Sequence, residues 1–428
     1  MLNALLPYVL RMRMRWPRLY QFVVNVGKRY LGNRFGVFPR VLAGEVAAVT
    51  GVLRGSQWNM AYGVGLEHER LEADFVKFLD VDCHAIAVNT GGMALQMSMR
   101  AIGCTPGDEI VHQADTCSAT AMAVMNAGCT PILADVLESS FMLDPNAADK
   151  WVSPATKGLI ATHMWGNPED IDGLRELTSK RGLLLIEDAC LSLGASFKGK
   201  MVGTLGDVAV FSFGCLKPIQ GGEGGLIVTR DDALARELRS LRHWGDRTKD
   251  FGVRDVTQLS WNGRMSEIVA AVVRQQLIGF PRHLEELRDG ASELERFLES
   301  IDGLSIVLGY GASVHNCSFT QLVFRLDENA FGWRRAPLVK ELSRLGLQAR
   351  AANFEPINTL SFFKGQAWAQ WLPRADIARV RGNYEQEFVA AGRIYREVGF
   401  GLGNANLLSR ENLSNLKRTL TALALRGK

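Results

Sequence analysis

The sequence lacks any patterned set of cysteines. Its seven cysteines form no C-x-x-C pair and stand near no histidines at zinc-finger spacing. The sequence therefore indicates neither a disulfide framework nor a structural metal site. An odd number of unpatterned cysteines is typical of the reducing cytoplasm. Apolar runs are short, since none approaches the roughly 20 residues of a membrane-spanning helix. Arginines also interrupt the first 20 residues where a signal peptide has its apolar core. We therefore expect a cytoplasmic protein.

Acidic residues are missing from the N-terminal segment. The first 44 residues hold eight arginines and lysines and no aspartate or glutamate. The remainder has 41 basic and 45 acidic residues, so that the net charge of the whole chain is only +4. Such a small net charge does not indicate a nucleic-acid partner, and none is expected. Residues 1–50 are predicted to form a basic N-terminal arm.

The basic arm has an amphipathic pattern. On a helical wheel its arginines fall mainly on one side and apolar residues, Trp16 among them, largely on the other. One interpretation is that residues 1–40 lie at the inner face of an anionic membrane, as a peripheral contact. The other is that the arm packs on the acidic body of the protein or across a dimer. We favour the second, because a segment with a strong apolar face more often faces a core.

Short apolar stretches alternate with helical patterns from about residue 84 to residue 230. Runs such as HAIAV, DEIVHQA and LLLIEDA are separated by helical segments. This alternation predicts an α/β fold with a mostly parallel central sheet. A long helical stretch follows and is expected to end at Pro281. We predict a large α/β domain over residues 51–280 and a smaller C-terminal α+β domain over residues 281–428.

Glycines and polar side chains gather at the predicted carboxyl ends of these strands, where α/β sheets bind ligands. In AIAVNTGGMAL, Thr90, Gly91 and Gly92 end a strand and open a helix, whose first amides form a phosphate-binding turn. LLLIEDA brings Asp188 to a strand end, and VAVFSF brings Ser212. Taken singly, the Gly-Gly segment is an ordinary turn and Asp188 is a helix cap. Their common edge makes them one candidate site.

A single lysine completes this set. Lys217 lies in FSFGCLKPIQGGEGG, where glycines would let the backbone bring its amine to a ligand. Pyridoxal 5'-phosphate (PLP) needs a lysine that binds its aldehyde and moves a proton. It also needs a carboxylate at its pyridine nitrogen and amides and a hydroxyl at its phosphate. No G-x-G-x-x-G follows a strand, which counts against a nucleotide-binding domain. The residues therefore indicate a PLP site.

From Trp58 onward the chain resembles the DegT/DnrJ/StrS-type sugar aminotransferases, which have the fold type I PLP-transferase fold. EDACLSLGASFKGKMVGTLGDVAVFSFGCLKPIQGGEGG is similar to the family motifs E-D-A-x-x-x-x-G-A, S-F-x-x-x-K and G-E-G-G, and NTGGMAL to its phosphate turn. The resemblance assigns Asp188 to the pyridine nitrogen, Ser212 to the phosphate and Lys217 to the covalent link. WNGRMSEIVAAVVRQQL resembles a segment that reaches the neighbouring subunit. Asn262 would then contact the phosphate across a homodimer interface.

The chain also departs from the family pattern. Leu191 stands where the family has Gln or His against the cofactor ring, and Cys117 stands where an aromatic residue usually stacks on it. Gly92 takes the place of a common threonine. His163, at the end of a predicted strand, has two interpretations of equal weight. It either supplies the missing hydrogen bond to the ring hydroxyl of the cofactor or is a hydrogen-bonded core histidine.

The resemblance implies an aminotransferase that moves nitrogen from glutamate or glutamine to a keto- or aldehyde sugar, nucleotide-linked or free. Amino-sugar biosynthesis for the cell envelope, such as lipopolysaccharide, is the preferred context because of the basic arm. One alternative is a PLP-dependent sugar dehydratase, but dehydratases of the family have His where this chain has Lys217. Another is a non-catalytic member of the fold, which the intact set of Asp188, Ser212 and Lys217 disfavours. The sequence leaves open the sugar, the carbon that is aminated and the donor.

Overall fold

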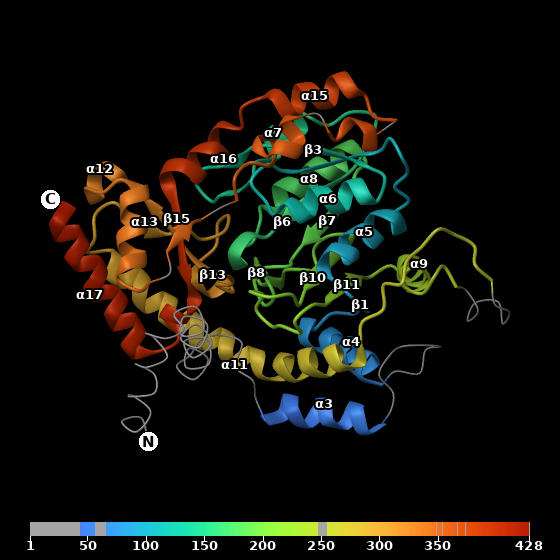
Figure 1. The fold of residues 1–428 in the computed structure, drawn as a ribbon, viewed down its shortest axis with the longest axis horizontal. Helices are drawn as coiled ribbons and strands as arrows, with labels where there is room; N and C mark the ends of the chain where they lie inside the picture. The colour runs from blue at the N-terminus through green and yellow to red at the C-terminus, as the bar shows by residue number, and fades with distance from the viewer. Residues whose placement is uncertain are drawn as a thin grey trace, which may run out of the picture. The chain divides into compact units, whose positions relative to one another are not determined.

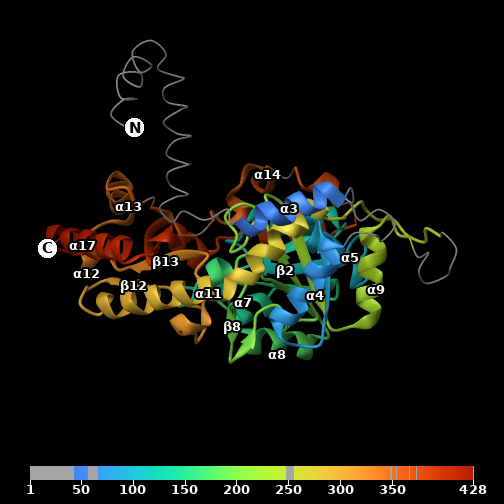
Figure 2. The same ribbon diagram turned by 90° about the horizontal axis from the view of Figure 1, so that it is seen from below.

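A computed structural model describes residues 43–55, 66–246, 255–347, 349–352, 354–365, 367–372 and 374–427. One compact unit begins at Ala43, and its first element is helix α3 (Ala43–Gly55), which packs beside helix α11 (Figures 1 and 2). The predicted arm up to residue 42, including the proposed membrane contact of residues 1–40, lies outside the described residues.

A seven-stranded sheet forms the centre of the fold. Its strand order is β1-β11-β10-β7-β6-β2-β3. The strands are β1 (His84–Val88), β2 (Glu109–Gln113), β3 (Thr130–Ala134), β6 (Thr156–Thr162), β7 (Leu184–Asp188), β10 (Val208–Ser212) and β11 (Gly225–Thr229). β11 pairs antiparallel with both of its neighbours, and the other neighbouring strands pair in parallel. The predicted α/β architecture with a mostly parallel sheet is confirmed.

Helices cover both faces of this sheet. Successive strand side chains point to opposite faces, so Ile160 and Ile186 pack on one face with α5 (Gly91–Ala101), α6 (Ser118–Asn126) and α9 (Asp232–Arg242). Leu159 and Leu185 pack on the other face, where α8 (Ile171–Arg181) lies. α4 (Glu67–Leu79) and the first half of α11 (Glu267–Leu298) cover the same face nearer β1. Because both faces are buried, the central positions of the strands are mostly apolar, and polar residues stand mainly at the strand ends.

A second, four-stranded antiparallel sheet has its own core. Its order is β12-β13-β15-β14, and α13 (Arg335–Arg344) and α17 (Arg410–Gly427) contribute to the core beside it. The strands are β12 (Leu304–Ile306), β13 (Gln321–Leu326), β14 (Arg350–Ala351) and β15 (Gly399–Gly403). The remaining helices and hairpins are α7 (Pro145–Asp149), α12 (Glu328–Phe331), α14 (Ser361–Lys364), α15 (Ile377–Glu385), α16 (Val389–Arg393), β4 (Val136–Leu137) with β5 (Met142–Leu143), and β8 (Ser196–Phe197) with β9 (Lys200–Met201).

The prediction that the long helix ends at Pro281 is wrong. α11 continues through Pro281 to Leu298 and runs from beside the large sheet to the second one (Figure 1). Proline removes one helical hydrogen bond and crowds the preceding turn. Burial offsets this cost on both sides, since Phe280 packs in the core of the large sheet and Leu287 in that of the second sheet. In the described part of the chain, no helix is both long and apolar enough to cross a membrane.

Candidate active site

Three parallel strands bring the predicted site residues to one edge of the large sheet. β7 ends at Asp188 and β10 ends at Ser212. β1 runs in the same direction, because both it and β10 are antiparallel to β11, which lies between them. β1 ends at Val88, two residues before Thr90. The carboxyl ends of these strands therefore meet at the edge where open α/β sheets bind ligands.

The phosphate turn (residues 90–92) is built on the start of α5. The Thr90 side chain caps this helix and accepts a hydrogen bond of 3.0 Å from the Met93 amide. Gly91 lies against Ser212, since a Cβ atom added to Gly91 would stand 2.7 Å from the Ser212 Cβ and 2.9 Å from its Oγ. A Cβ at Gly92 would meet nothing closer than the Thr90 Oγ1 at 4.0 Å. The first helical amides have no intrahelical acceptor, so they and the Ser212 hydroxyl form a cradle for an anion.

Asp188 is a buried carboxylate, 5% exposed, held by two hydrogen bonds. Its Oδ1 accepts from the Cys190 amide at 3.2 Å, and its Oδ2 accepts from the Thr120 hydroxyl at 3.3 Å. Thr120 lies in the first turn of α6. Thr120 is not among the residues predicted from the sequence, although its place one helical turn after Cys117 is a signal for it.

The half-buried thiol of Cys190 connects the parts of the site. Burial and the Asp188 carboxylate raise its pKa well above the ordinary value, whereas the Lys217 ammonium lowers it. The Cys117 thiol, at the start of α6, raises it further. Cys190 also touches the cradle, because a Cβ at Gly91 would lie 3.3 Å from its Sγ. The Cys190 thiol therefore lies beside the phosphate turn, where the charges of Asp188 and Lys217 act on it.

The Lys217 turn (residues 213–225) is fixed from α11. Gln276 accepts from the Gln220 amide at 2.7 Å and donates to the Gln220 carbonyl at 2.8 Å. Gln220 in turn donates to the Lys217 carbonyl at 3.2 Å. Gly221 lets the turn approach α11, since an added Cβ would lie 2.7 Å from Val269. The glycines thus allow close packing that fixes the backbone around a half-buried lysine.

His163 has both ring nitrogens in hydrogen bonds. Its Nδ1 accepts from the Glu169 amide at 3.0 Å, so the proton is on Nε2, which lies 3.1 Å from the Glu187 carboxylate. Although burial alone raises the pKa of Glu187, the hydrogen bonds from His163 and from the Gly203 and Gly206 amides lower it below its ordinary value. This geometry favours the core interpretation of His163.

Leu191 and Asn262 lie at the margins of the site. Leu191 is half-buried against the core on the α8 face, and its carbonyl accepts from the Thr320 hydroxyl. The backbone of Asn262 lies beside the phosphate turn of its own chain, because the Asn89 amide donates to Gly263 at 2.9 Å and the Asn89 side chain donates to the Asn262 carbonyl at 3.4 Å. The Asn262 side chain is exposed.

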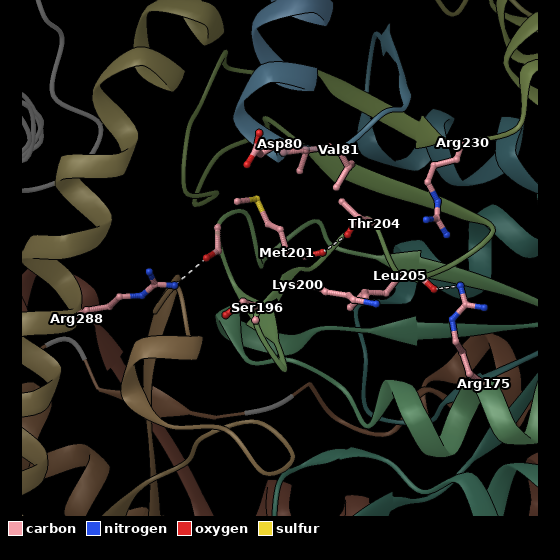
Figure 3. A pocket seen from close by; sticks show the side chains of 13 residues that line it. Asp80, Val81, Arg175, Ser196, Lys200, Met201, Thr204, Leu205, Arg230 and Arg288 are labelled. Atoms are coloured by element: carbon pink, nitrogen blue, oxygen red, sulfur yellow. Dashed lines mark hydrogen bonds between the residues drawn. The ribbon is translucent and has the colours of Figure 1, made fainter.

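A pocket of about 610 Å³ lies away from this site (Figure 3). Arg230 and Leu205 line it and stand after β11 and before β10. Since β11 is antiparallel, these positions mark the opposite edge of the sheet from Asp188. Two of its three guanidinium groups donate to backbone carbonyls, that of Arg288 to Gly194 and that of Arg175 to Leu205. The pocket shares no residue with the candidate site.

Comparison with known proteins decides the family. The model of the DegT/DnrJ/EryC1/StrS aminotransferase family matches residues 41–381. The chain belongs to this family. It is 34% identical over 322 residues, 74% of this chain and 80% of the relative, to a dTDP-3-amino-3,4,6-trideoxy-alpha-D-glucose transaminase of Streptomyces venezuelae. It is 34% identical to a GDP-perosamine synthase of Caulobacter vibrioides, over 65% of this chain and 73% of the relative.

A solved structure shares the fold of this chain. DesV of S. venezuelae, in complex with a ketimine intermediate, is 29% identical, covers 90% of this chain and 95% of its own, and has a TM-score of 0.76. The chain is therefore a PLP-dependent aminotransferase of the predicted fold class. Its own residues fit the cofactor: the Gly91–Ser212 cradle suits a phosphate, and Asp188 is a buried carboxylate near an amine, that of Lys217.

Proposed function

We propose that this aminotransferase moves an amino group from glutamate or glutamine to a keto or aldehyde carbon of a sugar. The observation that carries the proposal is that the Asp188 carboxylate and the Gly91–Ser212 cradle lie at one edge of the sheet, at the ends of neighbouring strands, with Lys217 in the turn that follows β10. A lysine, a buried carboxylate and an anion cradle in one small space are the groups that this reaction needs.

Each group has a distinct role in the proposed site. The α5 amides and the Ser212 hydroxyl hold the phosphate, and Asp188 faces the pyridine nitrogen. PLP supplies, when bound, an electron sink for the charge that develops at the reacting carbon. The Lys217 amine accepts the proton from that carbon and returns it at the other end of the transfer. Thr120 and the Cys190 amide keep the Asp188 carboxylate in place.

The sugar is proposed to be nucleotide-linked. Two relatives that are each 34% identical are named for sugars carried on different nucleotides, dTDP and GDP. Both names support a hexose attached to a nucleoside diphosphate, and the free sugar is the alternative. Amino-sugar biosynthesis for the cell envelope remains the context that we propose.

The active form is proposed to be a homodimer with shared sites. Asn262 is exposed next to the phosphate turn. Apolar side chains in the neighbouring segments are exposed too, Leu259 at 79%, Val256 at 56% and Trp244 at 50%. Exposed apolar groups gathered beside a site are typical of an interface. A second copy of the chain would cover them and receive the Asn262 side chain.

Spectroscopy of the two half-reactions tests the proposed function. PLP-loaded protein receives L-glutamate or L-glutamine, and the donor that serves the enzyme abolishes the visible absorbance of the cofactor. Addition of a dTDP- or GDP-linked keto sugar then restores the absorbance and yields an amino sugar by mass spectrometry. The proposal fails if no donor changes the spectrum, or if the sugar loses water without gaining nitrogen, which is the result for a dehydratase.

A further inference from the structure

Three polar side chains share one face of the large sheet on neighbouring strands. Thr162 on β6 is the direct cross-strand partner of Asp188 on β7. His112 on β2 pairs with Ile160, which precedes Thr162 by two residues and therefore points to the same face. Ile160 belongs to the core on the α5 and α6 side of the sheet. Thr162 thus lies between His112 and the Asp188 carboxylate.

His112 is fully buried, and its neutral ring has an acceptor to spare. Its Nδ1 lies 2.8 Å from the Gln113 carbonyl. Because a carbonyl only accepts, Nδ1 carries the proton and Nε2 carries a lone pair. Burial lowers the pKa of His112 to about 4, although the Gln113 carbonyl and the Asp188 carboxylate raise it. No group among the described residues forms a hydrogen bond with Nε2.

The Thr162 hydroxyl likewise lacks a hydrogen-bond partner within the described residues. Thr162 is only 4% exposed. A buried polar atom without a partner costs free energy, and here two such atoms lie on the same side of one carboxylate. Each Asp188 oxygen accepts one hydrogen bond from the protein and has capacity for a second. The hydroxyl supplies a donor and the carboxylate supplies an acceptor.

We propose that Thr162 and His112 are positioning residues for Asp188. One water molecule accepts from the Thr162 hydroxyl and donates both to His112 Nε2 and to Asp188, so that the last acceptor position of the carboxylate stays open for the pyridine nitrogen. With Thr120 and the Cys190 amide, they hold the carboxylate in the orientation that meets the pyridine nitrogen of the cofactor. The inference rests on the role proposed above for Asp188.

Thr162→Val separates this role from a structural one, because it replaces a hydroxyl with a methyl group of the same shape. If the hydroxyl is only a buried atom without a partner, the variant keeps its kcat and melts at the same or a higher temperature. If it positions Asp188, kcat falls about tenfold, the worth of one hydrogen bond. The KM values for donor and sugar stay the same, and Thr162→Ser restores the rate.

A double-mutant cycle shows whether the effect passes through Asp188. In an Asp188→Asn background, Thr162→Val is expected to cause no further loss of kcat, since residues that act as a unit are not additive. His112→Leu should lower kcat to the same extent as Thr162→Val, and the two together no further. Ser98→Ala is the matched control, because Ser98 is a fully buried hydroxyl on α5 that likewise has no hydrogen-bond partner within the described residues. It should leave kcat unchanged.

The positioning role of Thr162 and His112 and the proposed function fail on different experimental outcomes. An unchanged kcat for Thr162→Val beside a crippled Asp188→Asn overturns the positioning role and leaves the function standing. A full additional loss in the Asp188→Asn background also overturns it. If Asp188→Asn itself turns over normally, the role of Asp188 and this inference fail together.

Discussion

At the scale of single residues, the proposed chemistry depends most on Asp188. It is buried at a strand end, and two hydrogen bonds orient its oxygens. An amide in its place can still hydrogen-bond a pyridine nitrogen but cannot offset a positive charge there. The negative charge, more than the shape, is therefore what the site requires.

Asp188→Asn is expected to lower kcat by about 100-fold or more, in the range of other preorganised electrostatic groups. The affinity for PLP should fall much less, because the cradle of α5 and Ser212 is untouched. Stopped-flow kinetics with the donor, beside a PLP titration, checks both quantities. Near-normal turnover would show that this carboxylate is structural only.

The sequence predicted the residues whose position follows from strand direction. Asp188, Ser212 and the phosphate turn stand at carboxyl strand ends, and parallel strands necessarily bring such ends to one edge. His112 could not be found in the same way, because its partners depend on side-chain packing between elements. Thr120 had only an indirect signal, its place one helical turn after Cys117. For His163 the sequence left two alternatives, and the hydrogen bonds to Glu169 and Glu187 favour the core role.

At the scale of elements, the start of α5 decides how closely the phosphate turn meets β10. Gly91→Ala would push a Cβ to 2.7 Å from the Ser212 Cβ. Such overpacking costs about 1–3 kcal/mol, enough to weaken PLP binding by about tenfold or more. Fluorescence titration of the apoprotein with PLP measures the change.

Gly92→Ala is the matched control for Gly91→Ala. An added Cβ there meets only the Thr90 Oγ1 at 4.0 Å, so the fold and the helix start should tolerate it. PLP affinity is expected to stay within about threefold of that of the parent protein. Such a change in binding free energy is smaller than the contribution of one hydrogen bond. Equal losses in the two variants would show that the contact with Ser212 is not what shapes the cradle.

α11 shows where element prediction from sequence reaches its limit. The proline rule predicted an end at Pro281, and local preference supports that rule. Two separate cores bury the two halves of the helix, and this tertiary packing overrides the local preference. The α/β alternation was easier to interpret, because each strand is short, apolar and bounded by turns.

At the scale of the whole molecule, we expect two chains to complete each site. Lys217→Ala and Asn262→Ala are each expected to be nearly inactive alone. If Asn262 serves the site of the partner, mixing them recovers about a quarter of the full activity, because half of the dimers are hybrids and each has one complete site. Activity assays after co-refolding measure this recovery.

The same mixture also tests the alternative that Asn262 serves the site of its own chain, beside its own phosphate turn. In that case every site in a hybrid lacks one of the two groups, and no activity returns. Sedimentation of each variant provides the control, since both should form dimers. An enzyme that stays fully active as a monomer on dilution would contradict the shared site.

Reduction with borohydride tests the central claim most directly, the covalent role of Lys217 in a PLP enzyme. The PLP-loaded protein is reduced, digested and analysed by peptide mass spectrometry, with Lys217→Ala treated in parallel. We expect the visible absorbance to disappear and the mass of the reduced cofactor to appear on Lys217, with no labelled peptide in the variant. A label on a different lysine, or none at all in a protein that still transaminates, would contradict the account.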